Sequence, residues 1–397
     1  MPRFEPFAGL RFDAERFDLA DVTAPPYDVI DDEQRAALAA RSPRNIVHVD
    51  LPVAEGGRDR YANACHLLHA WMDDGTLVRD DEPSFYVYRM GYHDEQGRAH
   101  QTSGVIGALE LAESGVGDVL PHEQTTPKAR SDRLDMLRAC HANLSPVWGL
   151  SLAEGLGALC ELPGPPLARW TDDDGVHHRL YRIVEPGVID AIRDAVAGSP
   201  VLIADGHHRY ETSRVYRDER VAAGVATDAD GLTMTFVVEL SPEQLHVRAI
   251  HRLLSGLPQG FDLLGALAAR FEPFETDASD PTALLTRMAD AGALALVQPS
   301  GAWLLRPRPG AFDGVADLDS SRLSAALAEV PSVEVTYQHG ADTVVKRVGA
   351  GEAQAAVLLR PATVDQIAAT ASARTLMPPK TTFFWPKPRT GLVLRTL

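Results

Sequence analysis

A short apolar run that ends in a charged turn and continues as a helix is the feature that most constrains the fold of this chain. Residues 200–204 (PVLIA) are almost entirely apolar, which is typical of a short buried strand. Residues 205–209 follow as Asp-Gly-His-His-Arg, and the pattern after them predicts a helix over about 209–223. A strand that passes through a tight turn into a helix indicates a sheet with helices packed on it.

Strands and helices alternate along the rest of the chain as well. The predicted strands cover residues 45–51, 85–90, 103–109, 145–150, 232–240, 245–250, 293–298 and 355–359. The predicted helices and amphipathic stretches cover residues 32–40, 58–74, 133–142, 188–197, 262–270, 281–291, 319–329, 342–349 and 363–370. The predicted fold class is therefore α/β, with a mixed α+β arrangement included.

The length of 397 residues predicts two or three domains. A change of composition near 256–262 (GLPQGFD) indicates a boundary there. We expect an N-terminal α/β region over 1–112, a catalytic core over 113–258, and a C-terminal α/β region with an extended tail over 259–397.

The charge balance narrows the classes of partner. With 38 basic and 55 acidic side chains the net charge is −17, which argues against nucleic-acid binding and against an anionic membrane surface. No apolar run approaches the roughly 18 residues of a membrane span, and the N-terminus lacks the apolar core of a signal peptide. The three cysteines show no CxxC spacing, which fits a reduced, cytoplasmic protein.

The turn over 205–209 has the chemistry of an anion site. A helix N-terminus offers N–H groups and a positive dipole end, and Gly206 lets the backbone approach a ligand closely. His207, His208 and Arg209 add donors suited to phosphate oxygens. Asp205 would cap the helix, or hold Mg²⁺ or a substrate hydroxyl; the alternative is that Asp205 is only a cap and the two histidines are structural.

A second polar segment, 121–133 (PHEQTTPKARSDR), joins a carboxylate, hydroxyls and three cations within about a dozen residues. Glu123 would act as a base on a hydroxyl, and Lys128 would neutralise a transferring phosphoryl group. The alternative is a solvated loop held by salt bridges. No glycine-rich nucleotide loop occurs, so any nucleotide must be held by these two segments.

The positions of the lysines in the sequence favour a functional role for the same polar segment and for the C-terminal tail. The chain has 34 arginines and only four lysines, of which Lys128 lies in the polar segment and Lys380 and Lys387 lie in the tail over 377–388. The tail would close over a phosphorylated ligand, or its aromatic side chains would simply pack on the first domain. Asp50, at the end of a predicted strand, is a further candidate metal ligand.

Six segments together resemble the DUF1015 family along nearly the whole chain. These segments are 24–30 (APPYDVI), 45–52 (NIVHVDLP), 121–134 (PHEQTTPKARSDRL), 145–150 (SPVWGL), 203–213 (IADGHHRYETS) and 377–387 (MPPKTTFFWPK). The family name by itself implies no activity.

Two of these segments also resemble the paired motifs of the ParB/sulfiredoxin superfamily, and within it the free serine kinases. That resemblance implies a ParB/sulfiredoxin-like core with an insertion around 150–190. It makes Glu123 the base on the serine hydroxyl and the turn over 206–209 the phosphate binder, with Asp205 facing serine or a metal. Sulfiredoxin chemistry would need a cysteine beside the second motif, and 203–213 contain none.

These observations together predict a phosphotransferase for a small hydroxy amino acid, serine or O-phosphoserine, with Mg²⁺ and with ATP, ADP or pyrophosphate. The predicted catalytic residues are Glu123, Asp205 and His208, with Asp205 also as metal ligand. The predicted phosphate- or nucleotide-binding residues are Lys128, Arg130, Gly206, His207, Arg209 and Lys380. The predicted substrate-binding residues are His122, Thr125, Ser145 and Trp148. A nucleotide-binding regulator without turnover, a phosphoserine phosphatase and a homodimer are left open.

Overall fold

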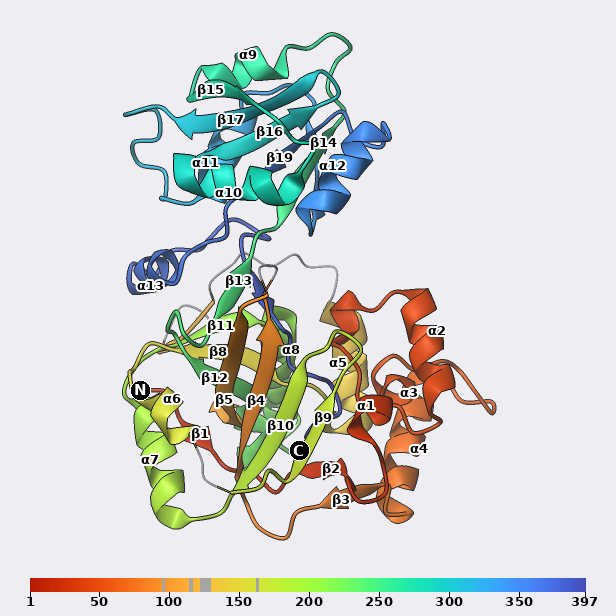
Figure 1. Cartoon of the computed structure of the whole chain (residues 1–397). Coiled ribbons are helices and arrows are strands. Elements are labelled where there is room, and N and C mark those ends of the chain that lie inside the picture. Colours follow the sequence, from red (N-terminus) through yellow and green to blue (C-terminus); the bar gives the residue numbers. More distant parts are fainter. Residues whose placement is uncertain (95–96, 114–116, 122–129, 162–163) are drawn as a thin grey trace. The chain divides into compact units, whose positions relative to one another are not determined.

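The computed structural model describes residues 1–94, 97–113, 117–121, 130–161 and 164–397, without the side chains of residues 130 and 131 (Figure 1). The chain divides into two compact units. The first unit contains Met1–His246 and Pro386–Leu397, and the second contains Val247–Trp385.

This division differs from the three regions expected from the sequence. A boundary at 112/113 would follow directly after β5 (Ala99–Glu110), which pairs with β12 (Leu232–Glu239) in one sheet. The end of the chain also returns to the first unit, where β21 (Arg395–Thr396) pairs with β7 (Ala142–Asn143). Strand pairing therefore joins residues 1–112 to the expected catalytic core in one unit.

The described part of the first unit is built on a sheet of nine strands in the order β6-β11-β8-β12-β5-β4-β10-β9, with β1 added beside β5. Its remaining strands are β1 (Phe4–Glu5), β4 (Phe85–His93), β6 (Val119–Pro121), β8 (Val147–Ser151), β9 (Ala168–Thr171), β10 (His177–Ile183) and β11 (Val201–Asp205). The β9 and β10 strands lie within the insertion expected around 150–190 and extend the sheet at the end opposite to β6. A separate pair, β2 (Leu10–Phe12) and β3 (Leu77–Arg79), completes the unit.

Helices cover this sheet and bring distant segments together (Figure 1). They are α1 (Leu19–Val22), α2 (Asp32–Arg41), α3 (Val47–Asp50), α4 (Arg60–Asp73), α5 (Arg130–Cys140), α6 (Leu156–Leu159), α7 (Pro186–Ala197) and α8 (His207–Ala222). In succession α3 contacts α4, α4 contacts α5, and α5 contacts α8. Tyr210 of α8 packs in the same buried cluster as Val201 of β11, which anchors α8 to the sheet.

The strand predicted over 45–51 is wrong, because this segment contains the short helix α3. The side chain of Asn45 accepts a hydrogen bond from the backbone N–H of Val47 at 3.0 Å, which favours a turn at this point. Ile46, Val47 and Val49 are all buried, so the apparent alternation does not separate a buried face from a solvated one.

The second unit has a six-stranded sheet in its described residues, in the order β15-β17-β16-β19-β14-β18. These strands are β14 (His251–Ser255), β15 (Phe271–Thr276), β16 (Leu294–Gln298), β17 (Gly301–Pro307), β18 (Glu334–Gln338) and β19 (Ala355–Leu358). Its helices are α9 (Leu263–Ala268), α10 (Pro281–Ala291), α11 (Asp319–Leu327), α12 (Ala341–Gly349) and α13 (Val364–Ser372). The short strands β13 (His246–Arg248) and β20 (Phe383–Trp385) pair with each other.

Each face of this second sheet carries a buried apolar cluster. Leu253 and Leu254 are neighbours on β14, yet they belong to two different apolar clusters. Successive strand residues point to opposite faces, so each cluster lies on its own side of the sheet. The five helices predicted in this part of the chain are all present, whereas β14, β15, β17 and β18 were not predicted.

The mixed α/β class is confirmed. Among the helices formed by the described residues, none combines the length and the apolar composition needed to cross a bilayer.

Candidate functional site

The two polar segments singled out in the sequence follow neighbouring strands. The β6 and β11 strands are parallel, with Val119 opposite Val201 and Pro121 opposite Ile203. Parallel neighbours end at the same edge of a sheet, which is where α/β proteins place their ligands. The turn over 205–209 leaves β11 at this edge. His122, Glu123, Thr125 and Lys128, which follow β6, lie outside the described residues.

The turn itself is shaped by Gly206, which is the N-cap of α8 and has φ of 85°. This left-handed conformation favours glycine, and a Cβ here would lie 2.8 Å from Nε of Arg209. No side chain caps this described helix, so the expectation that Asp205 is its N-cap is wrong. The first turn of α8 therefore begins at this edge of the sheet, directly after β11, with Gly206 as its N-cap.

The carboxylate of Asp205 binds two cations instead. Its Oδ1 lies 2.6 Å from Nζ of Lys387, and its Oδ2 accepts a hydrogen bond of 2.6 Å from Nη2 of Arg209. Burial would raise the pKa of Asp205, but Lys387 and Arg209 outweigh it and lower the pKa to about 2. Asp205 is therefore ionised, and it holds both cations beside the N-terminus of α8.

The two cations are held from further sides as well. Lys387 is 3.2 Å from Oδ2 of Asp28, and burial lowers its pKa less than the two carboxylates raise it. Nη1 of Arg209 donates to the carbonyl of Pro146 and to Oγ of Ser145, the latter at 3.3 Å. Both cations are thus pre-positioned and need little reorganisation to meet an anion.

A second buried ion pair lies next to the first. Nη1 of Arg133 donates to Oδ1 of Asp50 at 3.0 Å, and Nη2 of Arg133 donates to Oδ2 of Asp132 at 2.7 Å. The guanidinium carbon of Arg133 lies 4.4 Å from the ring centre of Tyr27, a cation–π distance. Burial raises the pKa of Asp50 above its usual value, although Arg133 and Arg209 oppose the shift.

Arg209 of the first ion pair and both residues of the second line a cavity of about 50 Å³. Its lining includes Tyr27, Asp50, Arg133, Ser145 and Arg209. Thr212, from the second turn of α8, also lines it, and its buried Oγ1 has no hydrogen-bond partner among the described residues. A buried hydroxyl in this state costs free energy until it is paired, so the cavity offers an unused polar contact to a small ligand.

The structure brings together several other predicted site residues. His207 and His208 form the first turn of α8, and His207 is close enough to help lower the pKa of Asp205. Trp148 lies opposite Asp205 in the pairing of β8 with β11, but its indole is buried and packs on Phe236. Their predicted roles, like that of Ser145, stay predictions.

The structure does not test two of the predicted phosphate binders, Arg130 and Lys380. Arg130 begins α5, and its side chain lies outside the described residues. Lys380 belongs to the second unit, where its backbone carbonyl accepts a hydrogen bond of 2.9 Å from Nη2 of Arg252. Their phosphate-binding roles stay predictions as well.

The list of predicted site residues lacked four residues that the structure places here, namely Lys387, Asp28, Asp50 and Arg133. Three of them had been considered apart from that list: Asp50 as a candidate metal ligand, Lys387 in the tail, and Arg133 among the cations of the second polar segment. Each of them lies in a segment that carried the family resemblance. For Lys387 there was a second signal, because a lysine stands out in a chain with 34 arginines.

The described residues do not by themselves fit a Mg²⁺ site. No group of three or more His, Cys, Asp or Glu side chains suited to a metal occurs among them. Both carboxylate oxygens of Asp205, the predicted ligand, are already bonded to Lys387 and Arg209. We therefore derive no step through a metal ion bound by Asp205.

Comparisons with known proteins give a family and distant structural neighbours. The family model described as "Protein of unknown function (DUF1015)" matches residues 4–321. A free serine kinase in complex with AMP is 13% identical and has a TM-score of 0.36; the match covers 67% of this chain and 83% of that one. A comparison with curated proteins found no match.

Two further solved structures match at similar levels. A conserved hypothetical protein from Pyrococcus furiosus is 13% identical with a TM-score of 0.36, over 68% of this chain and 88% of that chain. C-terminally truncated SbnI from Staphylococcus aureus is 11% identical with a TM-score of 0.39, over 72% and 85% of the two chains.

Proposed function

This chain belongs to the DUF1015 family, and we propose that it is a phosphotransferase. It exchanges a phosphoryl group between a nucleotide or pyrophosphate and the hydroxyl of a small amino acid. Serine is the best candidate for that amino acid. One observation carries the proposal: β6 and β11 are parallel neighbours, the segment after β6 contains Glu123, and the turn after β11 contains Arg209 in the first turn of α8.

The residues around Asp205 suit the recognition of phosphate. An ionised Asp205 orients Lys387 and Arg209, and a phosphate group at the N-terminus of α8 would be neutralised by both cations and by the first-turn N–H groups. Asp205 itself would act as a positioning residue. Its two bonds fix the cations and leave its oxygens no role in accepting a proton.

The cavity beside this turn suits the amino acid. Asp50 and Arg133 are oppositely charged, buried and close together in its wall. The ammonium and carboxylate groups of an amino acid carry the complementary charges. The hydroxyl of Thr212 adds a neutral hydrogen-bond partner for a small polar side chain.

The substrate hydroxyl loses its proton to the carboxylate of Glu123, its oxygen forms a bond to the transferring phosphorus, and the bond from phosphorus to the leaving phosphate oxygen breaks. Because this transition state is loose, positioning and charge neutralisation supply most of the catalysis. The reverse reaction, from phosphoserine, uses the same groups.

The test is an assay with defined donors. The full-length protein is incubated with serine, Mg²⁺ and ATP, ADP or pyrophosphate in turn, and phosphoserine is measured. Formation of phosphoserine with at least one donor supports the proposal. Nucleotide binding without product from any donor would overturn it in favour of a regulatory role, and release of inorganic phosphate from phosphoserine alone would favour a phosphatase.

A further inference from the structure

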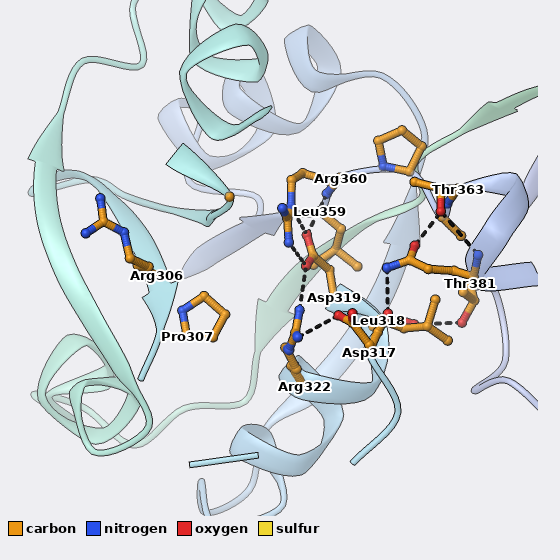
Figure 2. Close-up of a pocket in the computed structure, with 15 residues that line it drawn as sticks. Arg306, Pro307, Asp317, Leu318, Asp319, Arg322, Leu359, Arg360, Thr363 and Thr381 are labelled. Carbon is orange, nitrogen blue, oxygen red and sulfur yellow. Dashed lines mark hydrogen bonds and ion pairs between the residues drawn. The ribbon is translucent and has the colours of Figure 1, made fainter. Parts of the chain in front are cut away.

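The second unit contains a cavity of about 480 Å³ that the proposed function does not use (Figure 2). This volume is within the range of about 300–1,000 Å³ typical of small-molecule sites. All of its lining residues belong to the second unit. The lining is mainly polar, and it contains the arginines Arg306, Arg322 and Arg360 with the acids Asp317 and Asp319.

The carboxylate of Asp319 organises this cavity. It is buried and accepts hydrogen bonds from the backbone N–H, Nε and Nη2 of Arg360, at 2.9, 3.0 and 2.7 Å. Nη1 of Arg322 lies 3.9 Å from the same carboxylate. Figure 2 shows Arg360 and Arg322 meeting at Asp319, so one buried carboxylate fixes two guanidinium groups at the cavity wall.

The remaining edges of these guanidinium groups are placed for a ligand. Nη1 of Arg360 faces Gly292, another lining residue, where an added Cβ would lie 3.6 Å from it. Arg322 pairs at 2.6 Å with Asp317, a carboxylate that is 77% exposed and therefore easily replaced by a competing anion. Arg306 lines the cavity from β17 and is 51% exposed.

Two further features add neutral and dipolar donors. The α11 helix begins at Asp319 after Leu318, and no side chain caps this described N-terminus. Thr363 also lines the cavity with its hydroxyl group, and so does Thr381, whose hydroxyl already donates within the unit, to Ser320 or to Pro378. The three arginines exceed the two aspartates by one positive charge, in a chain whose net charge is −17.

From this arrangement we infer that the second unit binds a small phosphate monoester with a polar body, at a site separate from the proposed catalytic turn. Guanidinium groups with fixed orientation match the oxygens of a phosphate in pairs. A cavity of about 480 Å³ is far larger than a phosphate group, and its polar lining suits a hydroxylated body rather than an apolar one.

The test uses the full chain with three probes: ribose 5-phosphate, ribose and inorganic phosphate. Hydrogen exchange followed by mass spectrometry reads peptides that cover 317–323 and 359–366. We expect ribose 5-phosphate to slow exchange in both peptides. Absence of slowing in them would overturn the inference, and equal slowing by inorganic phosphate would overturn its assignment to an ester.

Point variants test which residues contact ribose 5-phosphate. Arg322→Gln leaves the exposed Asp317 without its partner, while the buried Asp319 keeps its bonds to Arg360, so the variant should fold. It should raise the ribose 5-phosphate concentration for half-maximal slowing about tenfold. Arg347→Gln is the matched control, because Arg347 pairs with Glu352 in the same unit and does not line the cavity. An unchanged response in Arg322→Gln would contradict the site. Lys387→Met should leave the response intact, which separates this site from the catalytic proposal.

Discussion

The ammonium group of Lys387 lies 2.6 Å from Oδ1 of Asp205, although 182 positions separate the two residues in the chain. Through this contact, Lys387 near the C-terminus lies beside the turn between β11 and α8. The contact places a nearly buried cation beside a helix N-terminus, where an anion would otherwise be expected. Lys387 is therefore a part of the proposed phosphate site.

Lys387→Met tests this contact through stability. The variant leaves the buried carboxylate of Asp205 with Arg209 alone, so we expect the free energy of unfolding to fall by about 3 kcal/mol. Urea denaturation at pH 7 measures the change. Lys346→Met is the control, because Lys346 is exposed on α12. Equal stability of Lys387→Met and wild type would contradict the buried pair.

The pH dependence of stability should report Asp205 at the acid end. Its pKa is about 2 in the folded chain against an ordinary value of 3.8, so its stabilising effect is complete above about pH 4 and is lost as the pH falls toward 2. The difference is worth about 2 kcal/mol. Urea titrations between pH 5 and pH 2 should show a smaller loss for Asp205→Asn than for wild type. Parallel curves would refute the assignment.

His251 should govern a different window in the second unit. Burial, with smaller contributions from His339 and Arg252, lowers its pKa from 6.5 to about 4, so the unfolded chain binds a proton in this range and the folded chain does not. Stability should fall by about 3 kcal/mol as the pH decreases from 6.5 to 4. Hydrogen exchange of peptides from β14 and β19 measures this loss, which His251→Gln should reduce. A slope that His251→Gln leaves unchanged would show that another group is responsible.

The Arg133–Asp50 pair should behave as one unit. Arg133→Gln leaves the buried Asp50 without its cation, and Asp50→Asn leaves Arg133 with Asp132 as its remaining carboxylate. Each single variant should destabilise the protein by about 3 kcal/mol. The double variant should lose clearly less than the sum of the two. Arg138→Gln is the control on the same helix, since its pair with Glu219 is exposed, and it should cost less than about 1 kcal/mol. Additive losses would mean that the pair is not coupled.

Local patterns in the sequence predicted most of the helices and many of the strands. The β11 strand and the α8 helix were predicted because an apolar run and an amphipathic stretch flank the turn over 205–209. The segment over 45–51 was misread, because buried residues on both sides of a short helix imitate the alternation of a strand. The strands β9 and β10 were missed, since β10 has many polar residues and is held in the sheet by pairing with the distant β4, and β9 pairs in turn with β10.

The sequence motifs of the site were predictable, but the contacts between residues from distant segments were not. Composition and spacing singled out Asp205 and Arg209, which are adjacent in the chain to the strand that positions them. The contacts with Lys387 and of Asp50 with Arg133 join segments that lie far apart in the sequence. Such contacts depend on how the sheet and helices assemble, and no local pattern encodes them.

In the proposed function, the site at the edge formed by β6 and β11 transfers a phosphoryl group to serine, and Glu123 is the base. The most direct measurement is the time course of phosphoserine formation by ³¹P NMR for wild type and Glu123→Gln, with serine, Mg²⁺ and the donor that the wild-type protein uses. We expect a phosphoserine signal for wild type, and a rate of phosphoserine formation at least about 100-fold lower for Glu123→Gln. Phosphoserine formation at the same rate by both proteins, or by neither with any donor, would contradict it.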